Sequence, residues 1–410
     1  MNTAFLDEYA ELAVKTGINL QENQRLVINS PIECADFARR IAMAAFQAGA
    51  GDVTMSWGDE QFARIRYTFG RDEIFETFPA WRREMYMSEM EAGAAFVSIH
   101  AADPEIFKDV KPSRLKAAQQ SSGMALLEYR QKLMNNENRW CVVSVPTEAW
   151  ARKVFPDLSS KAAVDRLWEE IFRTVHITGK KRAASAWEEH IAFLGRAAAF
   201  MNEHAFVRLE YKNERGTDLS IELPEGHIWM GGAEIAGDQV PFCANLPTEE
   251  IYTMPKRDGV NGTVVATRPL HYQGNLIENF RLTFKDGKVT DFSAERGEAI
   301  LRELLSTDDG SGYLGEVALV PVDSPIYASG ILFYNTLFDE NASCHLALGK
   351  AYPTCIKDGE KMGSVELLQH GVNDSLVHED FMVGSEDLSI DGIMKDGRQI
   401  AVFRDGKYAF

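Results

Sequence analysis

The chain has 410 residues, which is too long for one small hydrophobic core, so two domains are expected. Its apolar fraction of 45% and charged fraction of 25% are typical of a soluble globular protein. The net charge of −18 argues against a nucleic-acid partner, because such a protein needs a basic face that displaces counterions from phosphates.

No stretch approaches the ~18 uncharged apolar residues of a membrane helix, so no membrane partner is expected. The acidic start of the chain lacks the basic and apolar regions of a signal peptide. The five cysteines are odd in number and scattered, which suits a reducing compartment and excludes a cysteine zinc framework. The sequence therefore predicts a cytoplasmic protein.

Short apolar runs alternate with amphipathic helical stretches over the first 200 residues. The runs predict strands at Arg25–Ser30, Val53–Trp57, Ala95–Ile99 and Trp140–Val145. The helical patterns lie at Cys34–Ala48, Ser160–Thr174 and Ala184–Glu203. Strands that alternate with helices favour βαβ units, so residues 1–204 are predicted to form an α/β domain with a parallel sheet.

Hairpin signals replace this alternation from Phe206 onward. Phe206–Tyr211 and Leu219–Leu223 flank a turn, and a helix is expected near Glu295–Leu305. Further turns of the kind that joins antiparallel strands are predicted at Asp258-Gly259, Asn261-Gly262, Asp286-Gly287, Asp396-Gly397 and Asp405-Gly406. Residues 205–410 are therefore predicted to form an α+β domain with a largely antiparallel or mixed sheet.

His378 and Asp380 are the first candidate metal ligands in this second half. They lie in an apolar, β-branched run that is typical of a strand. Residues two apart on a strand point to the same face, so the imidazole and the carboxylate are expected to lie side by side, with Glu379 pointing away. Such a pair suits a divalent transition metal, although an ordinary hydrogen-bonded pair has the same spacing.

Other acidic residues and a histidine occur at predicted strand starts in the same half. Glu249 and Glu250 precede a β-prone segment, Glu316 begins an apolar strand, and Glu340 comes shortly before His345. Each cluster by itself is typical of a capped turn or a surface charge. Together they favour one shared metal site, because a buried carboxylate is costly unless it is paired or bound to a cation. The remaining histidines, His190 among them, lie in no carboxylate pattern and are predicted to be surface or satisfied core residues.

Ligation by carboxylate and imidazole without thiolate suits Zn, Co or Mn, and an excess of carboxylates suits two ions bridged by one acid. Two classes of protein, one catalytic and one non-catalytic, share this pattern of ligands. A dinuclear phosphoesterase uses similar ligands, but it also needs basic residues that clamp phosphate, and Lys350 is the one basic residue near His345. A non-catalytic metal-binding or peptide-binding protein is the other alternative.

Four motifs of the second half resemble the aminopeptidase T family of metallopeptidases (peptidase family M29). They are Pro247-Thr-Glu-Glu250, Gly315-Glu-Val-Ala318, Asp339-Glu-Asn-Ala-Ser-Cys-His345 and His378-Glu-Asp380. The resemblance implies a cytosolic, homodimeric aminopeptidase that acts on peptides with a free N-terminus. It also implies two divalent ions (Zn, Co, Mn or Mg) in the C-terminal domain. The implied ligands are Glu250, Glu316, Glu340, His345, His378 and Asp380.

Peptide hydrolysis suggests roles for two of the residues in and near these motifs. A metal ion lowers the pKa of water toward ~7, and a second ion can hold the substrate. Glu316 is predicted to bridge both ions. Tyr352 is predicted either to donate a hydrogen bond to the tetrahedral oxyanion or to be a packed core tyrosine.

Overall fold

The protein is described here by a computed structural model that covers residues 2–101, 103–272 and 275–410. The chain divides into two compact units. The first comprises residues 1–189 and 233–247, and the second comprises residues 190–232 and 248–410. The boundary expected after residue 204, which falls at the end of helix α9 (Ala183–His204), stays a prediction.

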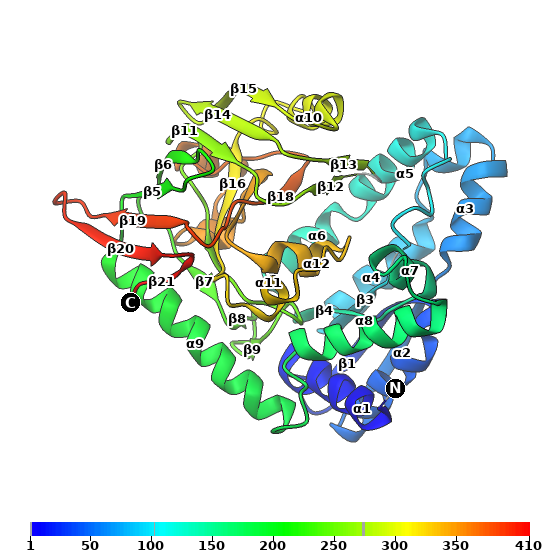
Figure 1. The fold of residues 1–410 in the computed structure, drawn as a ribbon. Helices are drawn as coiled ribbons and strands as arrows, with labels where there is room; N and C mark the ends of the chain where they lie inside the picture. Colours follow the sequence, from blue (N-terminus) through cyan, green and yellow to red (C-terminus); the bar gives the residue numbers. More distant parts are fainter. Residues whose placement is uncertain (1, 102, 273–274) are drawn as a thin grey trace. The chain divides into compact units, whose positions relative to one another are not determined.

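The first unit is built on a four-stranded sheet with the strand order β2-β1-β3-β4, of which β1, β3 and β4 are labelled in Figure 1. Each pair of neighbouring strands is parallel, which confirms the predicted parallel sheet. The strands are β1 (Arg25–Pro31), β2 (Asp52–Gly58), β3 (Ala95–His100) and β4 (Trp140–Ser144).

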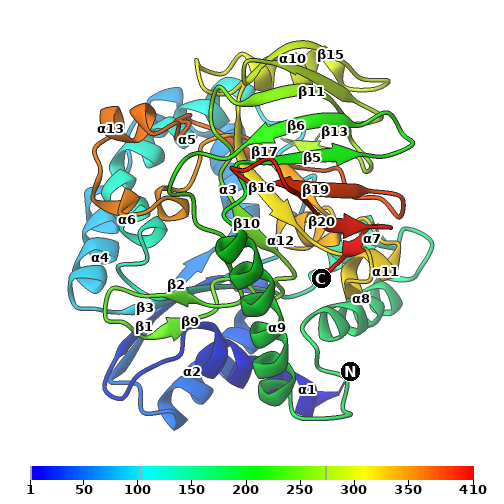
Figure 2. The same cartoon turned by 90° about the vertical axis from the view of Figure 1, so that its left-hand side faces the viewer.

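Helices cover both faces of this sheet, as its apolar strands require. On one face, Met87 of α4 and Tyr129 of α6 pack against Val27 and Phe96. Figure 2 shows α2 on the opposite face from α4. The helices of this unit are α1 (Thr3–Leu12), α2 (Ala35–Gln47), α3 (Glu60–Phe69), α4 (Ala80–Glu91), α5 (Pro112–Ala125), α6 (Leu127–Met134), α7 (Glu148–Val154) and α8 (Ser160–Thr174). A small hairpin joins β8 (Glu234–Ile235) to β9 (Pro241–Phe242).

The second unit contains two larger antiparallel sheets, which confirms the predicted α+β class with an antiparallel sheet. One has five strands in the order β18-β17-β16-β10-β7, and the other has eight in the order β15-β14-β11-β6-β5-β19-β20-β21 (Figure 2). Apolar side chains from both sheets, such as Leu346 and Ile221, belong to one buried cluster. The two sheets therefore share a hydrophobic core.

The five-stranded sheet consists of β7 (Met230–Gly231), β10 (Ile251–Thr253), β16 (Leu314–Leu319), β17 (His345–Gly349) and β18 (His378–Met382). The eight-stranded sheet consists of β5 (Arg208–Lys212), β6 (Asp218–Glu222), β11 (Val260–Val265), β14 (Arg281–Lys285), β15 (Lys288–Ser293), β19 (Ser389–Ile393), β20 (Gln399–Arg404) and β21 (Lys407–Tyr408). The hairpin β12 (Leu270–Tyr272) and β13 (Asn275–Ile277) and the helices α10 (Glu298–Leu305), α11 (Pro325–Ser329), α12 (Thr336–Asp339) and α13 (Ser364–Gln369) complete the unit. None of the described helices combines the length and the apolar character that a membrane span needs.

The turn predicted at Asn261-Gly262 is wrong, because both residues lie inside β11. Gly262 has a φ of +114°, and a Cβ atom there would lie 2.2 Å from the carbonyl oxygen of Asp218 on the neighbouring strand. Asn261 instead accepts a hydrogen bond from the backbone N–H of Asp286. The glycine is therefore required by the close approach of two strands and not by a chain reversal.

Candidate metal centre

The six candidate ligands lie on, or immediately before, neighbouring strands of the five-stranded sheet. Glu316 lies on β16, His345 on β17, and His378 and Asp380 on β18. The other two lie outside the strands. Glu250 comes just before β10, and Glu340 begins the short turn Glu340–Ala342 that leads to β17. The pairing order of the strands brings together residues that are up to 130 positions apart in the sequence.

Alternation along the strands separates these side chains from the hydrophobic core. Leu346 of β17 and Phe381 of β18 point into the core that the two sheets share. His345 and Asp380 are their direct neighbours along the strands, so their side chains point to the opposite face. The prediction that His378 and Asp380 share one face agrees with the 3.6 Å between Nε2 of His378 and Oδ1 of Asp380.

A β-bulge at Gly315 places Glu316 on that same face. Leu314 pairs with Leu348 and Glu316 pairs with Ala347, so the register shifts by one residue between them. Leu314 is a core residue, and in a regular strand Glu316, two positions later, would also point into the core. The bulge turns the carboxylate toward the histidines instead.

Gly315 allows this bulge because it has no side chain. A Cβ atom on Gly315 would lie 2.3 Å from the carbonyl oxygen of Lys350 and 2.4 Å from that of Gly349. We expect Gly315→Ala to destabilise the protein by about 1–3 kcal/mol and to weaken metal binding, since the strand must move to relieve the clash. Urea unfolding and metal titration by competition with a chelator measure the two effects.

Gly195→Ala is the matched control, because Gly195 lies in α9 with open space around its Cα atom. An alanine there is expected to leave metal affinity unchanged and to stabilise the helix slightly. If both alanine variants had the stability and metal affinity of the unmodified protein, the bulge would have no part in placing Glu316.

Glu316 lies between the two histidines, with one carboxylate oxygen facing each. Its Oε1 is 3.4 Å from Nε2 of His345, and its Oε2 is 3.6 Å from Nε2 of His378. His345 also lies 3.0 Å from Oε2 of Glu250. Five of the candidate ligands thus form two groups, Glu250-Glu316-His345 and Glu316-His378-Asp380, and within each group the potential ligand atoms all lie within 4.8 Å of one another. Glu316 belongs to both groups.

The backbone orients both imidazole rings. Nδ1 of His345 lies 3.2 Å from the carbonyl oxygen of Ser343, and Nδ1 of His378 lies 2.6 Å from that of Lys350. A carbonyl oxygen only accepts hydrogen bonds, so each Nδ1 carries the proton. Nε2 of each ring therefore faces the carboxylates, which is the orientation of a metal-binding histidine once that nitrogen has lost its proton.

Burial and mutual charge shift the pKa values of this cluster. Burial raises the pKa of Glu316 and, with the charges of Asp380 and Glu250, raises that of Glu340 well above its usual range. Burial alone lowers the pKa of His345, but the carboxylates of Glu250 and Glu316 outweigh it and raise that pKa well above 6.5. The cluster thus strongly favours added positive charge, from protons or from metal ions.

The residues present fit a divalent metal. Oε2 of Glu250 and Oδ1 of Asp380 are buried and form no hydrogen bond with any described residue, and the close contact to His345 lacks hydrogen-bond geometry. Within the described ranges, no lysine or arginine forms an ion pair with any of the six candidate ligands. Buried carboxylate oxygens without a cation are costly, and a bound metal ion removes that cost.

Tyr352 lies beside the cluster. Its ring packs edge-on against His378 with 5.0 Å between ring centroids. Burial first, and then the charges of Glu316, Asp380 and other carboxylates, raise the pKa of its hydroxyl well above 10. The hydroxyl therefore lies within the field of the candidate ligands, while the side chain also packs against a buried apolar cluster that includes Met254 and Ile356.

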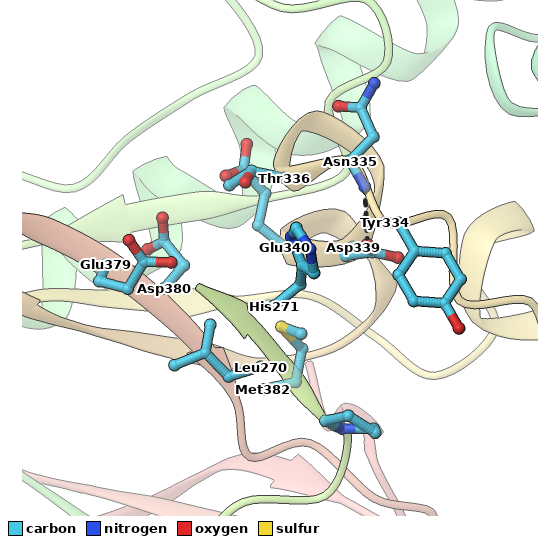
Figure 3. A pocket seen from close by; sticks show the side chains of 11 residues that line it. Leu270, His271, Tyr334, Asn335, Thr336, Asp339, Glu340, Glu379, Asp380 and Met382 are labelled. Carbon is cyan, nitrogen blue, oxygen red and sulfur yellow. Dashed lines mark hydrogen bonds between the residues drawn. The ribbon is translucent and has the colours of Figure 1, made fainter. Parts of the chain in front are cut away.

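A hollow borders the cluster between β12, α12 and β18 (Figure 3). It contains about 350 Å³ of space that protein atoms do not fill, including space open to solvent. Leu270 and Thr336 line it together with Glu340 and Asp380. Two of the candidate ligands therefore border a space that another molecule can enter.

His190 is a contributor that the sequence did not indicate. Its Nε2 lies 2.7 Å from the carbonyl oxygen of Thr248 and 3.7 Å from a carboxylate oxygen of Glu249. It therefore holds the segment that leads to Glu250. No local pattern could have revealed this, because 58 residues separate His190 from Thr248.

Buried carboxylates and imidazoles that the backbone orients, around oxygens that lack hydrogen-bond partners among the described residues, define a candidate site for divalent metals, of the kind found in metal-dependent hydrolases. The sequence matches the model of the thermophilic metalloprotease (M29) family over residues 2–408, and the chain belongs to this family. The family expected from the four motifs is thereby confirmed.

The chain is similar along its whole length to several aminopeptidases. It is 50% identical over 405 residues to "Aminopeptidase 2" of Geobacillus stearothermophilus. The matched region covers 99% of this chain and 98% of that protein. It is 45% identical over 405 residues, with the same coverage, to "Aminopeptidase AmpS" of Bacillus subtilis (strain 168). The solved structure of wild-type AmpT from Thermus thermophilus superposes with a TM-score of 0.93 at 38% identity and covers 100% of both chains.

Proposed function

We propose that this protein is a metal-dependent aminopeptidase that removes the N-terminal residue of small peptides at a site for two divalent ions. The family and the relatives named as aminopeptidases support the class of reaction. The observation that carries the proposal of two ions is the position of Glu316, which belongs to both groups of potential ligand atoms.

Each ion would have its own set of residues. Glu250 and His345 would hold one ion, His378 and Asp380 would hold the other, and Glu316 would contact both. Glu340, whose pKa responds to the charges of Asp380 and Glu250, would complete the set. Divalent ions held in this way lower the pKa of water and polarise a peptide carbonyl. The protein's part is to fix the Nε2 atoms of both histidines and to keep four carboxylates in one buried cluster.

Other residues would bind and orient the substrate. The hollow lined by Leu270 and Thr336 leads to Glu340 and Asp380 and would receive the first residues of a peptide. The hydroxyl of Tyr352 would donate a hydrogen bond to the oxyanion of the tetrahedral intermediate. The carboxylates would attract the free α-ammonium group of the substrate, since they form no ion pair with a described lysine or arginine.

The ligand chemistry suits Zn, Co, Mn or Mg, because the cluster offers oxygen and nitrogen atoms and no thiolate. Cys344, the cysteine next to His345, points away from the site, and its Sγ contacts the carbonyl oxygen of Val320. We further propose that the protein is a cytoplasmic homodimer without nucleic-acid or membrane partners, as the family resemblance and the net charge suggest. Sedimentation analysis tests the dimer.

Removal of metal is expected to abolish peptidase activity, because no ion would then lower the pKa of the attacking water or polarise the peptide carbonyl. The protein is dialysed against EDTA and assayed on leucine p-nitroanilide before and after addition of Co(II) or Zn(II). Activity should fall to background and return with added metal. Elemental analysis of the reloaded protein should give two ions per chain.

The same preparation distinguishes the alternative functions. p-Nitrophenyl phosphate serves as the test of a phosphoesterase and should give no metal-dependent turnover. Hydrolysis of the phosphate ester alone would favour the phosphoesterase, and metal binding without either activity would favour a non-catalytic binding protein. Full peptidase activity in a sample free of metal would contradict the proposal.

A further inference from the structure

Asn341 is fully buried and lies in the sequence between the candidate ligands Glu340 and His345. It lies in the short turn that follows Glu340 and comes four residues before His345. Its exposed fraction is 0%. A polar side chain that is completely buried must satisfy its hydrogen-bonding groups inside the protein.

The side-chain amide of Asn341 joins three parts of the chain. Its Oδ1 accepts a hydrogen bond of 2.7 Å from the backbone N–H of Glu249. Its Nδ2 donates to the carbonyl oxygen of Leu337 at 3.1 Å and to Oε1 of Glu340 at 3.4 Å. The residue thus ties the segment that carries Glu250 to the turn that carries Glu340.

An amide is the side chain that these contacts require. Glu249 N–H needs an acceptor, whereas the carbonyl oxygen of Leu337 and the carboxylate of Glu340 need a donor. Aspartate at position 341 would place an oxygen against both acceptors, and an apolar residue would remove the oxygen that accepts from the N–H of Glu249. The partners also fix which end of the amide is the oxygen.

We propose that Asn341 is a positioning residue that sets the metal affinity of the site by holding Glu250 and Glu340 at a fixed separation. Glu250 follows the hydrogen-bonded Glu249 directly, so a shift of that backbone moves its carboxylate. Residues that orient ligands through hydrogen bonds commonly change metal affinity when they are replaced. The inference rests on the proposed metal-dependent function and adds a determinant of metal affinity to it.

The experiment compares Asn341→Asp and Asn341→Ser with the unmodified protein in its full-length, metal-free form. Asn341→Asp keeps the size of the side chain and loses the donor, while Asn341→Ser shortens it. Zn(II) or Co(II) is titrated in competition with a chromophoric chelator. Both variants are expected to bind metal roughly 10–100-fold more weakly. Excess metal should restore most of the peptidase activity of Asn341→Ser, which a merely structural defect would not allow.

Ser324→Ala is the matched control for loss of packing. Ser324 is buried and donates to the backbone carbonyl oxygens of Asn341 and Ala342, but it touches no candidate ligand. It also caps the N-terminus of α11. Ser324→Ala should therefore lower the thermal midpoint of the metal-free protein and leave metal affinity within about twofold, far below the change expected of a ligand-orienting residue.

Unchanged metal affinity in both Asn341 variants, or an equal loss in Ser324→Ala, would overturn the inference. Glu316→Gln separates this outcome from failure of the proposed function. If Glu316→Gln loses metal while the Asn341 variants keep it, only the positioning role is wrong. If Glu316→Gln binds as much metal as the unmodified protein, Glu316 does not bridge the ions and the proposed two-ion site fails.

Discussion

Glu316→Gln is expected to lower kcat/KM for leucine p-nitroanilide by roughly 10³-fold or more and to reduce bound metal below two ions per chain. The two carboxylate oxygens of Glu316 face the Nε2 atoms of His345 and His378 at 3.4 and 3.6 Å. Glutamine has nearly the same shape, but it carries no charge and turns an NH₂ group toward one of these positions. One substitution therefore weakens both groups of ligands.

Glu303→Gln is the matched control for this loss of a carboxylate. Glu303 is exposed on α10 and takes no part in the cluster. Steady-state kinetics and elemental analysis of both variants, at a fixed Zn(II) concentration, give activity and occupancy together. A Glu316→Gln protein that kept both ions and at least a tenth of the activity would show that Glu316 does not bridge them.

The sequence predicts well the parts of the site that depend on neighbouring residues. The spacing of His378 and Asp380 is sufficient to place them on one face, because the side-chain period of a strand is two. The apolar run after Glu316 is likewise sufficient to predict a buried strand. Both predictions rest on the geometry of a single strand and need no knowledge of its partners.

The order of strands in the sheet is not available from such local patterns. β16 pairs with β10 and β17, and β17 pairs with β18, so the site depends on pairings between residues that lie 27 to 68 positions apart in the sequence. The resemblance of the four motifs to a known family implied a shared set of ligands, but it did not give the order of the strands that carry them. Hydrophobic periodicity predicts that strands exist, but it does not determine which strands become neighbours.

Two further features depend on tertiary approach and left no clear pattern in the sequence. The bulge at Gly315 exists because the carbonyl oxygens of Gly349 and Lys350 come close to it. Asn341 and His190 act on the segment before Glu250 from positions 92 and 58 residues away from their partners. Asn261-Gly262 shows the opposite error, since a dipeptide typical of turns lies within a strand. In each case the contact that decides the conformation comes from a distant part of the chain.

Tyr352→Phe tests how much the protein's own side chains contribute to catalysis beyond holding the metal ions. We expect the variant to lower kcat by roughly 10²–10³-fold, as loss of an oxyanion donor does. Metal content should stay unchanged, because Tyr352 is not among the candidate ligands and its ring still packs against His378. Burial and the nearby carboxylates raise the pKa of its hydroxyl and keep it protonated, which is the state that can donate. KM should change less than kcat, since the oxyanion forms only on the way to the transition state.

Tyr211→Phe is the matched control for this deletion of a hydroxyl. Tyr211 is fully buried in the core of the second unit, and its hydroxyl forms no hydrogen bond with any described residue. Its loss is expected to leave kcat unchanged and to stabilise the protein slightly, because an unsatisfied buried polar atom is removed. A Tyr352→Phe variant with the kcat of Tyr211→Phe would make Tyr352 a packing residue. If Tyr352→Phe lost both kcat and bound metal, its hydroxyl would act by orienting the ligands and not by contacting the substrate.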